Sequence, residues 1–267
     1  MSLEILTSFS NPKIKYASSL HDSKTRRAEG RFIIEGPREI QAAIRAKVSF
    51  GTVFVCPELI TDATIPIFES IKDRSDLKVF SVNEKLYEKI SYGEKMEGLA
   101  VIAKNPSTSR ALPEKPQSGV WLVLENLEKP GNIGAILRTA DGAGVAGIIL
   151  NNASSDLYHP NIIRSSQGSI FYHPLHVATV AETVAWLKTH KITSMALTPE
   201  GSKNLYTVDL KSNVAVVFGT EHEGLSPEWL KAADQRIKIP MNGKIDALNV
   251  SVSVAVVLYE AVRQNNK

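Results

Sequence analysis

The chain has 267 residues, 43% of them hydrophobic and 22% charged, which is enough to bury a sizeable core in one large domain or two of ordinary size. It has no run near the roughly 18 apolar residues that a membrane span needs, and its N-terminus is polar where a secretory signal would be apolar. Composition therefore predicts a cytoplasmic protein with no membrane partner, and the single cysteine, Cys56, excludes an intrachain disulfide.

The distribution of charge says more than its sum. A net charge of +3 is too small to indicate a nucleic-acid partner, because such partners require cations that cluster on one face. Residues 1–47 hold nine Lys and Arg against five Asp and Glu, a net charge of +4, and the rest of the chain is about neutral. A solvated helix face and an RNA-binding face both explain this distribution.

The N-terminal part of the sequence predicts a small α/β domain over residues 1–104. A helical pattern at 35–46 leads into an apolar run at 52–56, which is typical of a buried strand. A second apolar run at 77–82 precedes a helical pattern at 84–90.

A linker is predicted over 105–119, because its three prolines, three serines and one glycine break both helical and strand periodicity. After it, over 120–267, short β-rich runs alternate with helical patterns. Such interleaving implies a mainly parallel sheet with helices on both faces. The predicted strands are 120–124, 147–150, 192–197, 214–219 and 236–239, and the predicted helices are 133–143, 161–166, a short one after Ser226, and 248–264.

A glycine-rich string from Gly142 to Gly147 matches the G-x-G-x-x-G pattern of dinucleotide-binding proteins. In those proteins the string follows a strand and opens a helix, whose N-terminus faces a pyrophosphate. Here the order is inverted, because the glycines close a helix and lead into a strand, as a C-cap does. The string therefore predicts a helix end, and a nicotinamide-dependent oxidoreductase stays a minor alternative.

Other catalytic signatures are absent from the sequence. It contains no phosphate-binding loop, no G-x-S-x-G nucleophile elbow and no H-E-x-x-H zinc pair. Its six histidines are scattered, and a single cysteine argues against a structural zinc site. No metal site is predicted.

Polar segments follow the predicted strands, at the positions where open α/β sheets bind ligands. In the first segment Asn132 occupies the expected N-cap of a helix, and Arg138 falls off the apolar stripe of that helix. In the second a buried strand ends at Gly219 and is followed by Glu221 and by Ser226, which precedes proline as an N-cap does. A cap, a solvated cation and an ordinary turn would give the same residues, so structural and functional interpretations both stay open.

The third segment follows a predicted strand end at Ile239 and a loop that contains Gly243. From Leu248 onward it is rich in valine, whose β-branched side chain favours a strand. We nevertheless predict a helix, because the segment is long, ends in a polar run at 260–264 and is apolar enough to lie between layers.

Together the three segments resemble, in order and spacing, the sequence motifs of the SpoU (TrmH-like) RNA methyltransferases of the SPOUT superfamily. The resemblance covers residues 120–265, and residues 10–15 and 32–36 more loosely resemble the separate RNA-substrate-binding domain of that family. The matching motifs are NIGAILRT from Asn132 to Thr139, FGTEHEGLS from Phe218 to Ser226 and IPMNGKIDALNVSV from Ile239 to Val252.

The resemblance implies an α/β fold in which the C-terminal, mainly parallel sheet carries a deep trefoil knot, beside a small, ribosomal-protein-like N-terminal α/β domain. The knotted loops would hold S-adenosylmethionine in a bent conformation, largely through backbone groups. By position, the cofactor-binding residues would be Leu197, Thr198, Gly219, Ile239, Met241 and Leu248.

The same resemblance implies methylation of a ribose 2'-hydroxyl by a homodimer whose active site combines residues of both subunits. Arg138 would be central, with Asn132, Glu221 and Asn249 around it. A guanidinium is effectively always protonated, so stabilising a developing alkoxide and gripping an adjacent phosphate is physically easier for it than acting as a base. The separate N-terminal domain favours ribosomal RNA over transfer RNA as the partner.

One departure from the family pattern concerns Ala247, where most relatives have serine. The absence of this hydroxyl leaves three explanations open. Water or Ser251 replaces it, the activity of the enzyme is weak, or the protein only binds RNA. We predict an active enzyme, and the main alternative is an RNA-binding or ribosome-assembly protein with a vestigial cofactor pocket.

Overall fold

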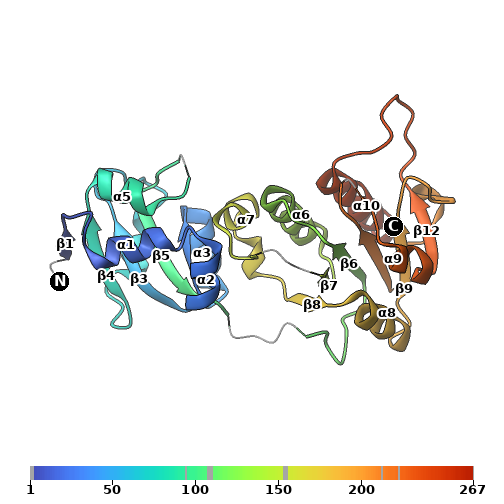
Figure 1. Cartoon of the computed structure of the whole chain (residues 1–267), viewed down its shortest axis with the longest axis horizontal. Helices are drawn as coiled ribbons and strands as arrows, with labels where there is room; N and C mark the ends of the chain where they lie inside the picture. The colour runs from blue at the N-terminus through green and yellow to red at the C-terminus, as the bar shows by residue number, and fades with distance from the viewer. Residues whose placement is uncertain are drawn as a thin grey trace. The chain divides into compact units, whose positions relative to one another are not determined.

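The computed structural model describes residues 3–93, 95–106, 111–152, 156–211, 213–221 and 223–266. They form two compact units (Figure 1). The N-terminal unit comprises Met1–Thr108 and Asp156–Tyr172, and the C-terminal unit comprises Ser109–Ser155 and His173–Lys267. Among the described residues, no helix has the length and apolar character that crossing a membrane requires.

The N-terminal unit is built on a five-stranded mixed sheet of order β1-β4-β3-β5-β2. β1, β4 and β3 are parallel, whereas β5 runs antiparallel to both β3 and β2. Its strands are β1 (Glu4–Leu6), β2 (Arg31–Glu35), β3 (Phe50–Val55), β4 (Lys78–Val82) and β5 (Leu99–Lys104). Its helices before residue 109 are α1 (Pro12–Ser19), α2 (Ser23–Glu29), α3 (Pro37–Arg45), α4 (Ile65–Ile71) and α5 (Glu84–Ile90).

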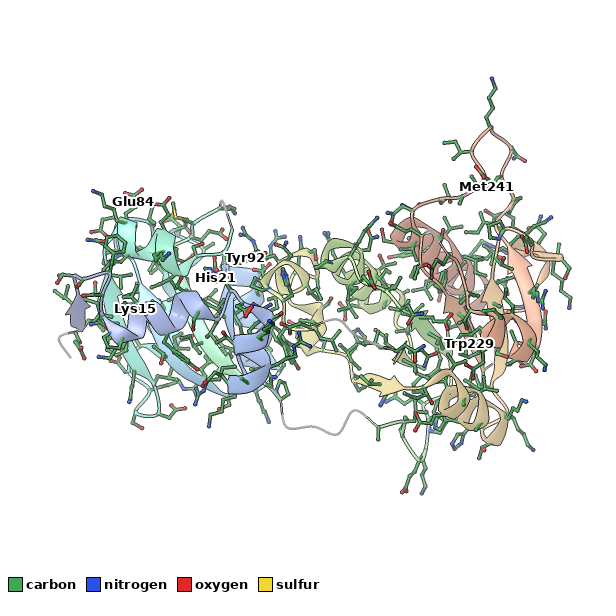
Figure 2. All side chains as sticks on the ribbon, in the orientation of Figure 1. Lys15, His21, Glu84, Tyr92, Trp229 and Met241 are labelled. Atoms are coloured by element: carbon green, nitrogen blue, oxygen red, sulfur yellow. The ribbon has the colours of Figure 1, made fainter. Side chains whose placement is uncertain are left out.

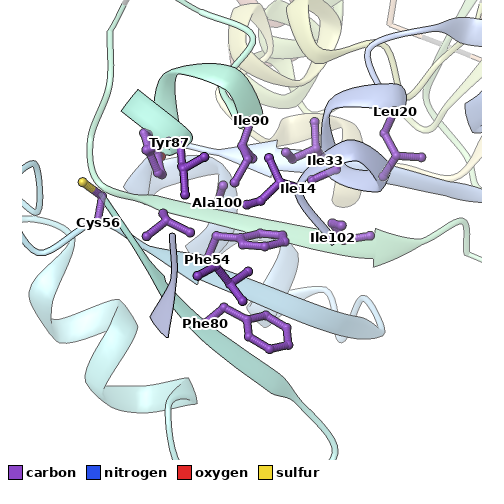
Figure 3. Close-up of a cluster of buried hydrophobic side chains, with 14 residues drawn as sticks. Ile14, Leu20, Ile33, Phe54, Cys56, Phe80, Tyr87, Ile90, Ala100 and Ile102 are labelled. Carbon is purple, nitrogen blue, oxygen red and sulfur yellow. The ribbon is translucent and has the colours of Figure 1, made fainter. Parts of the chain in front are cut away.

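Buried side chains from both strands and helices form the core of this unit (Figure 3). Ile14 of α1 and Tyr87 of α5 pack with Phe54 of β3 and Ile102 of β5, all of them buried. The two strands and two helices predicted here are confirmed as β3, β4, α3 and α5. The sequence prediction missed β1, β2, β5, α1, α2 and α4, which are short or lack a clear period.

A segment from the middle of the chain belongs to the N-terminal unit. It contains α7 (Pro160–Ser165), the predicted helix at 161–166, and the 3-10 turn η1 (Ser169–Phe171). The Tyr158 ring stacks on Phe32 of β2, with ring centroids 4.3 Å apart and an interplanar angle of 12°. Arg26, only 2% exposed, donates from Nε to Asp156 Oδ2 at 2.5 Å. Part of the N-terminal positive charge is therefore structural and not available to RNA.

The C-terminal unit is built on a seven-stranded sheet of order β10-β12-β9-β11-β6-β7-β8, in which every adjacent pair is parallel. This confirms the parallel α/β sheet predicted from the sequence. The sequence prediction missed β8 and the two-residue β10. The strands are β6 (Val120–Glu125), β7 (Gly147–Asn151), β8 (Leu175–Ala178), β9 (Thr193–Leu197), β10 (Lys203–Asn204), β11 (Val214–Phe218) and β12 (Gln235–Lys238).

Helices cover both faces of this sheet. Trp121 and Val123 of β6 pack with side chains of α8 (Val180–Thr189), which the sequence prediction missed, and α9 (Pro227–Ala232). Because side chains alternate along a strand, Leu122 and Leu124 face the other side, where α6 (Pro130–Ala143) and α10 (Val250–Asn265) pack together (Figure 1).

Two predictions from this part of the sequence are confirmed. The string at 142–147 ends a helix, because Gly144 caps α6 with a φ of 67°, the left-handed conformation that favours glycine. The valine-rich segment is the helix α10, capped by Asn249 and buried at Val254 and Val257. Tertiary burial therefore outweighs the β-propensity of valine.

The predicted linker is partly packed against the C-terminal unit, although residues 107–110 lie outside the described residues. Leu112 packs on the core formed by Trp121 and its neighbours, and Trp186 Nε1 donates to the Pro113 carbonyl at 2.8 Å. The domain limits 1–104 and 120–267 and the trefoil knot stay predictions.

Candidate active site

The loops of the site follow three neighbouring strands. β12, β9 and β11 are adjacent and parallel, so their carboxyl ends meet at one edge of the sheet, where open α/β sheets bind ligands. A cavity of about 430 Å³ lies there, lined mainly by residues 197–200, 219–221, 223–225, 239, 241 and 246–248. Sites for small molecules commonly measure about 300–1,000 Å³.

All six residues that the resemblance implies for cofactor binding line this cavity. They are Leu197, Thr198, Gly219, Ile239, Met241 and Leu248. Met241 lies at the base of the loop that extends from β12 (Figure 2). The cavity wall also contains four carboxylates, from Glu200, Glu221, Glu223 and Asp246, of which the sequence analysis singled out only Glu221. Their position in the same strand-end loops is the signal that could have found the other three.

Gly219 is required by a close backbone approach. Thr220 N donates to the Gly224 carbonyl at 3.0 Å and Gly224 N donates to the Thr220 carbonyl at 3.2 Å, which closes a tight turn. A Cβ on Gly219 would lie 2.0 Å from the Gly224 carbonyl oxygen. The absence of a side chain at 219 therefore serves the turn itself, in addition to any approach by a ligand.

A polar cluster at the edge of the cavity consists of Lys129, Asn132, Glu221 and Asn249. Glu221 Oε1 accepts from Asn132 Nδ2 at 2.6 Å and from Asn249 Nδ2 at 2.7 Å. Glu221 Oε2 accepts from Lys129 Nζ. Three side chains that the resemblance implied as catalytic are thus joined, although they are far apart in the chain. Both oxygens of this carboxylate therefore accept hydrogen bonds from neighbouring side chains.

Asn249 has two roles in the local structure. Its Oδ1 accepts from Ser251 N at 2.9 Å and caps α10, which leaves its Nδ2 free to donate to Glu221. Ser251 Oγ donates to the same Oδ1 at 2.6 Å, and Ala247 lines the cavity, as does Ser253. The hydroxyl of Ser251 is therefore committed to orienting Asn249.

One prediction about the first segment is wrong. Asn132 is not the N-cap of α6, because Lys129 occupies that position, Pro130 begins the helix, and Asn132 lies within its first turn. Proline is favoured there because it needs no N–H partner. Asn132 is instead positioned to donate to Glu221 across the cavity edge.

The structure does not bring Arg138 to the cavity of its own chain. Arg138 lies on the exposed side of α6, beside the buried Ile136 and Leu137, and is not among the described residues that line the cavity. Gly219 and Glu221 line one hollow and Asn249 donates to Glu221, whereas none of the hydrogen bonds among the described residues joins Arg138 to this group.

Lys129 is the member of the cluster that the sequence analysis missed. It caps α6 without a side-chain hydrogen bond to the helix backbone. The positive end of a helix dipole disfavours a cation, so lysine at this position is the signal that could have identified it. Among the described residues, no group of three His, Cys, Asp or Glu side chains could hold a metal ion.

A ligand-sized cavity and an amide–carboxylate cluster at the carboxyl edge of a parallel sheet define an α/β protein with a site for a small molecule. Residues 119–259 match the model of the SpoU rRNA methylase family, and residues 11–101 match the MRM3-like substrate binding domain. The chain belongs to the SpoU rRNA methylase family.

Solved structures and a curated relative support this membership. A crystal structure of an RNA 2'-O ribose methyltransferase is 36% identical, with a TM-score of 0.89 over 98% of this chain and 100% of that one. An AdoMet-bound rRNA methyltransferase from Sinorhizobium meliloti is 27% identical, with a TM-score of 0.85 over 98% of each chain. The 23S rRNA guanosine 2'-O-methyltransferase of Bacillus subtilis is 23% identical over 95% of this chain and 97% of its own length.

Proposed function

We propose that this protein transfers a methyl group from S-adenosylmethionine to a ribose 2'-hydroxyl of ribosomal RNA. The observation that carries the proposal is the junction of Asn132, Glu221 and Asn249 beside a cavity lined by all six residues implied for cofactor binding. Relatives named as rRNA 2'-O-methyltransferases and an AdoMet-bound neighbour support the same activity. We place it in the cytoplasm on the basis of a ribosomal RNA substrate.

The residues present fit S-adenosylmethionine. This cofactor carries a sulfonium and an ammonium against one carboxylate, and the four carboxylates of the cavity wall favour such a net positive ligand. Backbone groups of Gly219, Ile239 and Leu248 at the cavity wall would supply polar contacts, and Met241 and Leu225 would supply apolar ones. When bound, the cofactor supplies a methyl carbon that its sulfonium activates.

The protein's own contribution is to align the hydroxyl and to manage its proton. In our proposal Asn132 and Asn249 fix the Glu221 carboxylate, so that the edge of the cavity keeps one geometry when RNA arrives. A ribose hydroxyl becomes a strong nucleophile as it loses its proton, and a guanidinium stabilises the resulting charge. We assign that stabilising role to Arg138.

A homodimer would reconcile this role with the position of Arg138 away from its own cavity, because an exposed arginine on α6 could serve the cavity of a second protomer. Beside α6, the helix α10 exposes Val252 and Tyr259, two turns apart on one face, with Leu248 preceding them. An apolar stripe of this kind is typical of a subunit interface. We infer that α6 and α10 form it.

The test combines binding and transfer. Calorimetry with S-adenosylmethionine should give a dissociation constant at or below the order of 100 μM, and the full chain should transfer a tritiated methyl group from it to unmodified 23S rRNA transcript. Mapping of ribose methylation in ribosomal and transfer RNA, from cells with and without the gene, should find one ribosomal position that depends on it. A position in transfer RNA would redirect the proposal to that substrate.

A second candidate is an RNA-binding or ribosome-assembly protein with a vestigial cofactor pocket. It is favoured by Ala247, which puts a methyl group in the cavity where the family has a hydroxyl. RNA binding without detectable cofactor binding at millimolar concentration would select this candidate over the enzyme.

A further inference from the structure

The cavity has a strongly acidic wall. Four of the residues that line it are Asp or Glu, and among the described lining residues none is Lys or Arg. RNA carries one negative charge per nucleotide, so a ribose that approaches this cavity brings phosphates toward several carboxylates. The phosphates and the carboxylates repel each other, and this repulsion is strongest where solvent screens it least. The edge of the cavity therefore needs a cation where the backbone of the RNA passes.

Lys129 meets this need by position. Its Nζ contacts Oε2 of the Glu221 carboxylate. The other oxygen of this carboxylate, Oε1, accepts from the amides of Asn132 and Asn249. The Lys129 side chain is 63% exposed, whereas that of Glu221 is 20% exposed. Lys129 thus lies on the outer side of the carboxylate, toward solvent. An ammonium has three N–H donors, and Glu221 uses one of them.

We propose that Lys129 is a substrate-binding residue that contacts a phosphate of the RNA beside the target ribose. The proposal rests on the proposed function, and it assigns to Lys129 a role separate from that of Arg138. A lysine is suited to this task because it binds phosphate as a compact charge and imposes little on direction. Glu221 holds the long lysine side chain at the edge of the cavity before RNA arrives, which reduces the entropy lost on binding.

The carboxylate of S-adenosylmethionine is the other anion that could reach an ammonium here. Lys129 is not among the described residues that line the cavity, and it lies outside Glu221. A phosphate that arrives from solvent is therefore its better partner. The two ligands make opposite predictions for cofactor affinity, and the experiment separates them.

The experiment compares full-length Lys129→Met, Lys129→Arg and Lys188→Met with the wild type. Lys188 is an exposed lysine on α8, which contributes no residue to the cavity, so its replacement controls for the general loss of one positive charge. Binding of unmodified 23S rRNA transcript is measured at several salt concentrations, cofactor affinity is measured by calorimetry, and methyl transfer is measured in parallel.

Lys129→Met should weaken RNA binding about five- to tenfold and reduce the slope of log affinity against log salt by about 0.7 to 0.9, the value of one phosphate contact. Cofactor affinity should stay within twofold of the wild type, and both Lys129→Arg and Lys188→Met should bind RNA like the wild type. An unchanged salt slope in Lys129→Met overturns the proposal, and so does a loss of RNA binding in Lys129→Arg equal to that in Lys129→Met.

Two further outcomes separate this proposal from the function on which it rests. If Lys129→Met loses cofactor affinity and keeps the salt slope, Lys129 serves the cofactor and the proposal is overturned. If the wild type transfers no methyl group but its RNA binding depends on Lys129 as described, the enzymatic function fails and the role of Lys129 in RNA binding is supported.

Discussion

The two units place the same pair of chemical groups in opposite environments. In the N-terminal unit the cation Arg26 is buried with Asp156 and fixes a segment that is distant in sequence. In the C-terminal unit the cation Lys129 meets Glu221 at an exposed cavity edge. Burial makes the first pair a structural element, because the Arg26 guanidinium has almost no access to solvent or to a ligand. Exposure leaves the second pair able to exchange its partner for a ligand.

The sheets differ in the same sense. In the mixed sheet β1, β4 and β3 run parallel, but β5 runs antiparallel to β3 and β2, so its carboxyl end points to the opposite edge. In the parallel sheet the carboxyl ends of β9, β11 and β12 share one edge, and their loops build the cavity. The shared direction of β9, β11 and β12 thus lets motifs that are distant in sequence build one site in the C-terminal unit. The following predictions test this division between structural and functional residues.

The largest effect is expected from Gly219→Val. The new Cβ would lie 2.0 Å from the Gly224 carbonyl oxygen, so the turn that borders the cavity must open. We expect cofactor affinity to fall more than about 1,000-fold, because the backbone at 219 and 224 would no longer hold its position. Calorimetry measures the loss. Gly243→Ala is the matched control, since nothing lies within 4 Å of a Cβ there and affinity should be unchanged.

The next effect concerns the N-terminal unit. Asp156→Asn leaves the Arg26 guanidinium buried without its counterion, which costs about 3 kcal/mol in the free energy of unfolding. Urea denaturation should show this loss while cofactor affinity stays the same. Asp76→Asn removes the partner of Arg74 in a solvent-exposed pair of the same unit, and it should leave the urea midpoint nearly unchanged. Equal losses in both variants would contradict the structural role of Arg26.

Arg138→Lys should reduce turnover about 100-fold and leave cofactor affinity within twofold. Lysine keeps the charge but loses the planar fork of donors that a guanidinium offers to an alkoxide and a phosphate. Single-turnover methyl transfer to ribosomal RNA measures the effect. Turnover close to that of the wild type would remove Arg138 from the mechanism.

Mixing Arg138→Lys subunits with Gly219→Val subunits would test whether two protomers share an active site. A partly active mixture requires that one protomer supplies the arginine and the other supplies the cavity.

Most strands of the parallel sheet could be predicted from the sequence, because buried strands and amphipathic helices leave clear periodic patterns in it. It also placed Asn132, Glu221 and Asn249 together, through motifs whose order matches a known family. It did not single out Lys129, because this residue precedes the first motif and its ion pair with Glu221, 92 positions away, leaves no periodic pattern. Nor could it show that Asp156–Tyr172 joins the N-terminal unit, since only tertiary contacts such as Tyr158 on Phe32 decide that.

The smallest effect follows from Cys56, the one cysteine of the chain, which lies buried in the N-terminal unit. Burial, aided by the hydrogen bond to Glu58, raises the pKa of its thiol from 9.0 to about 11. The Cys56 thiol of the folded protein therefore keeps its proton at pH values at which the thiol of the unfolded chain has released it. Stability contributed by the neutral thiol is complete below pH 9 and declines as the pH rises toward 11.

Between pH 9 and pH 10 this decline should amount to about 1 kcal/mol in the free energy of unfolding. Cys56→Ala has no thiol to ionise. The difference between this variant and the wild type in the pH dependence of the free energy of unfolding therefore separates the contribution of the thiol from those of titrating lysines and tyrosines. Equal slopes in the two proteins would mean that the thiol is accessible to water in the folded state. Because only the N-terminal unit contains a thiol, alkylation of Cys56 also reports the opening of that unit alone. Asp156→Asn should accelerate alkylation, and Gly219→Val should not, which separates the stability of one unit from the binding function of the other.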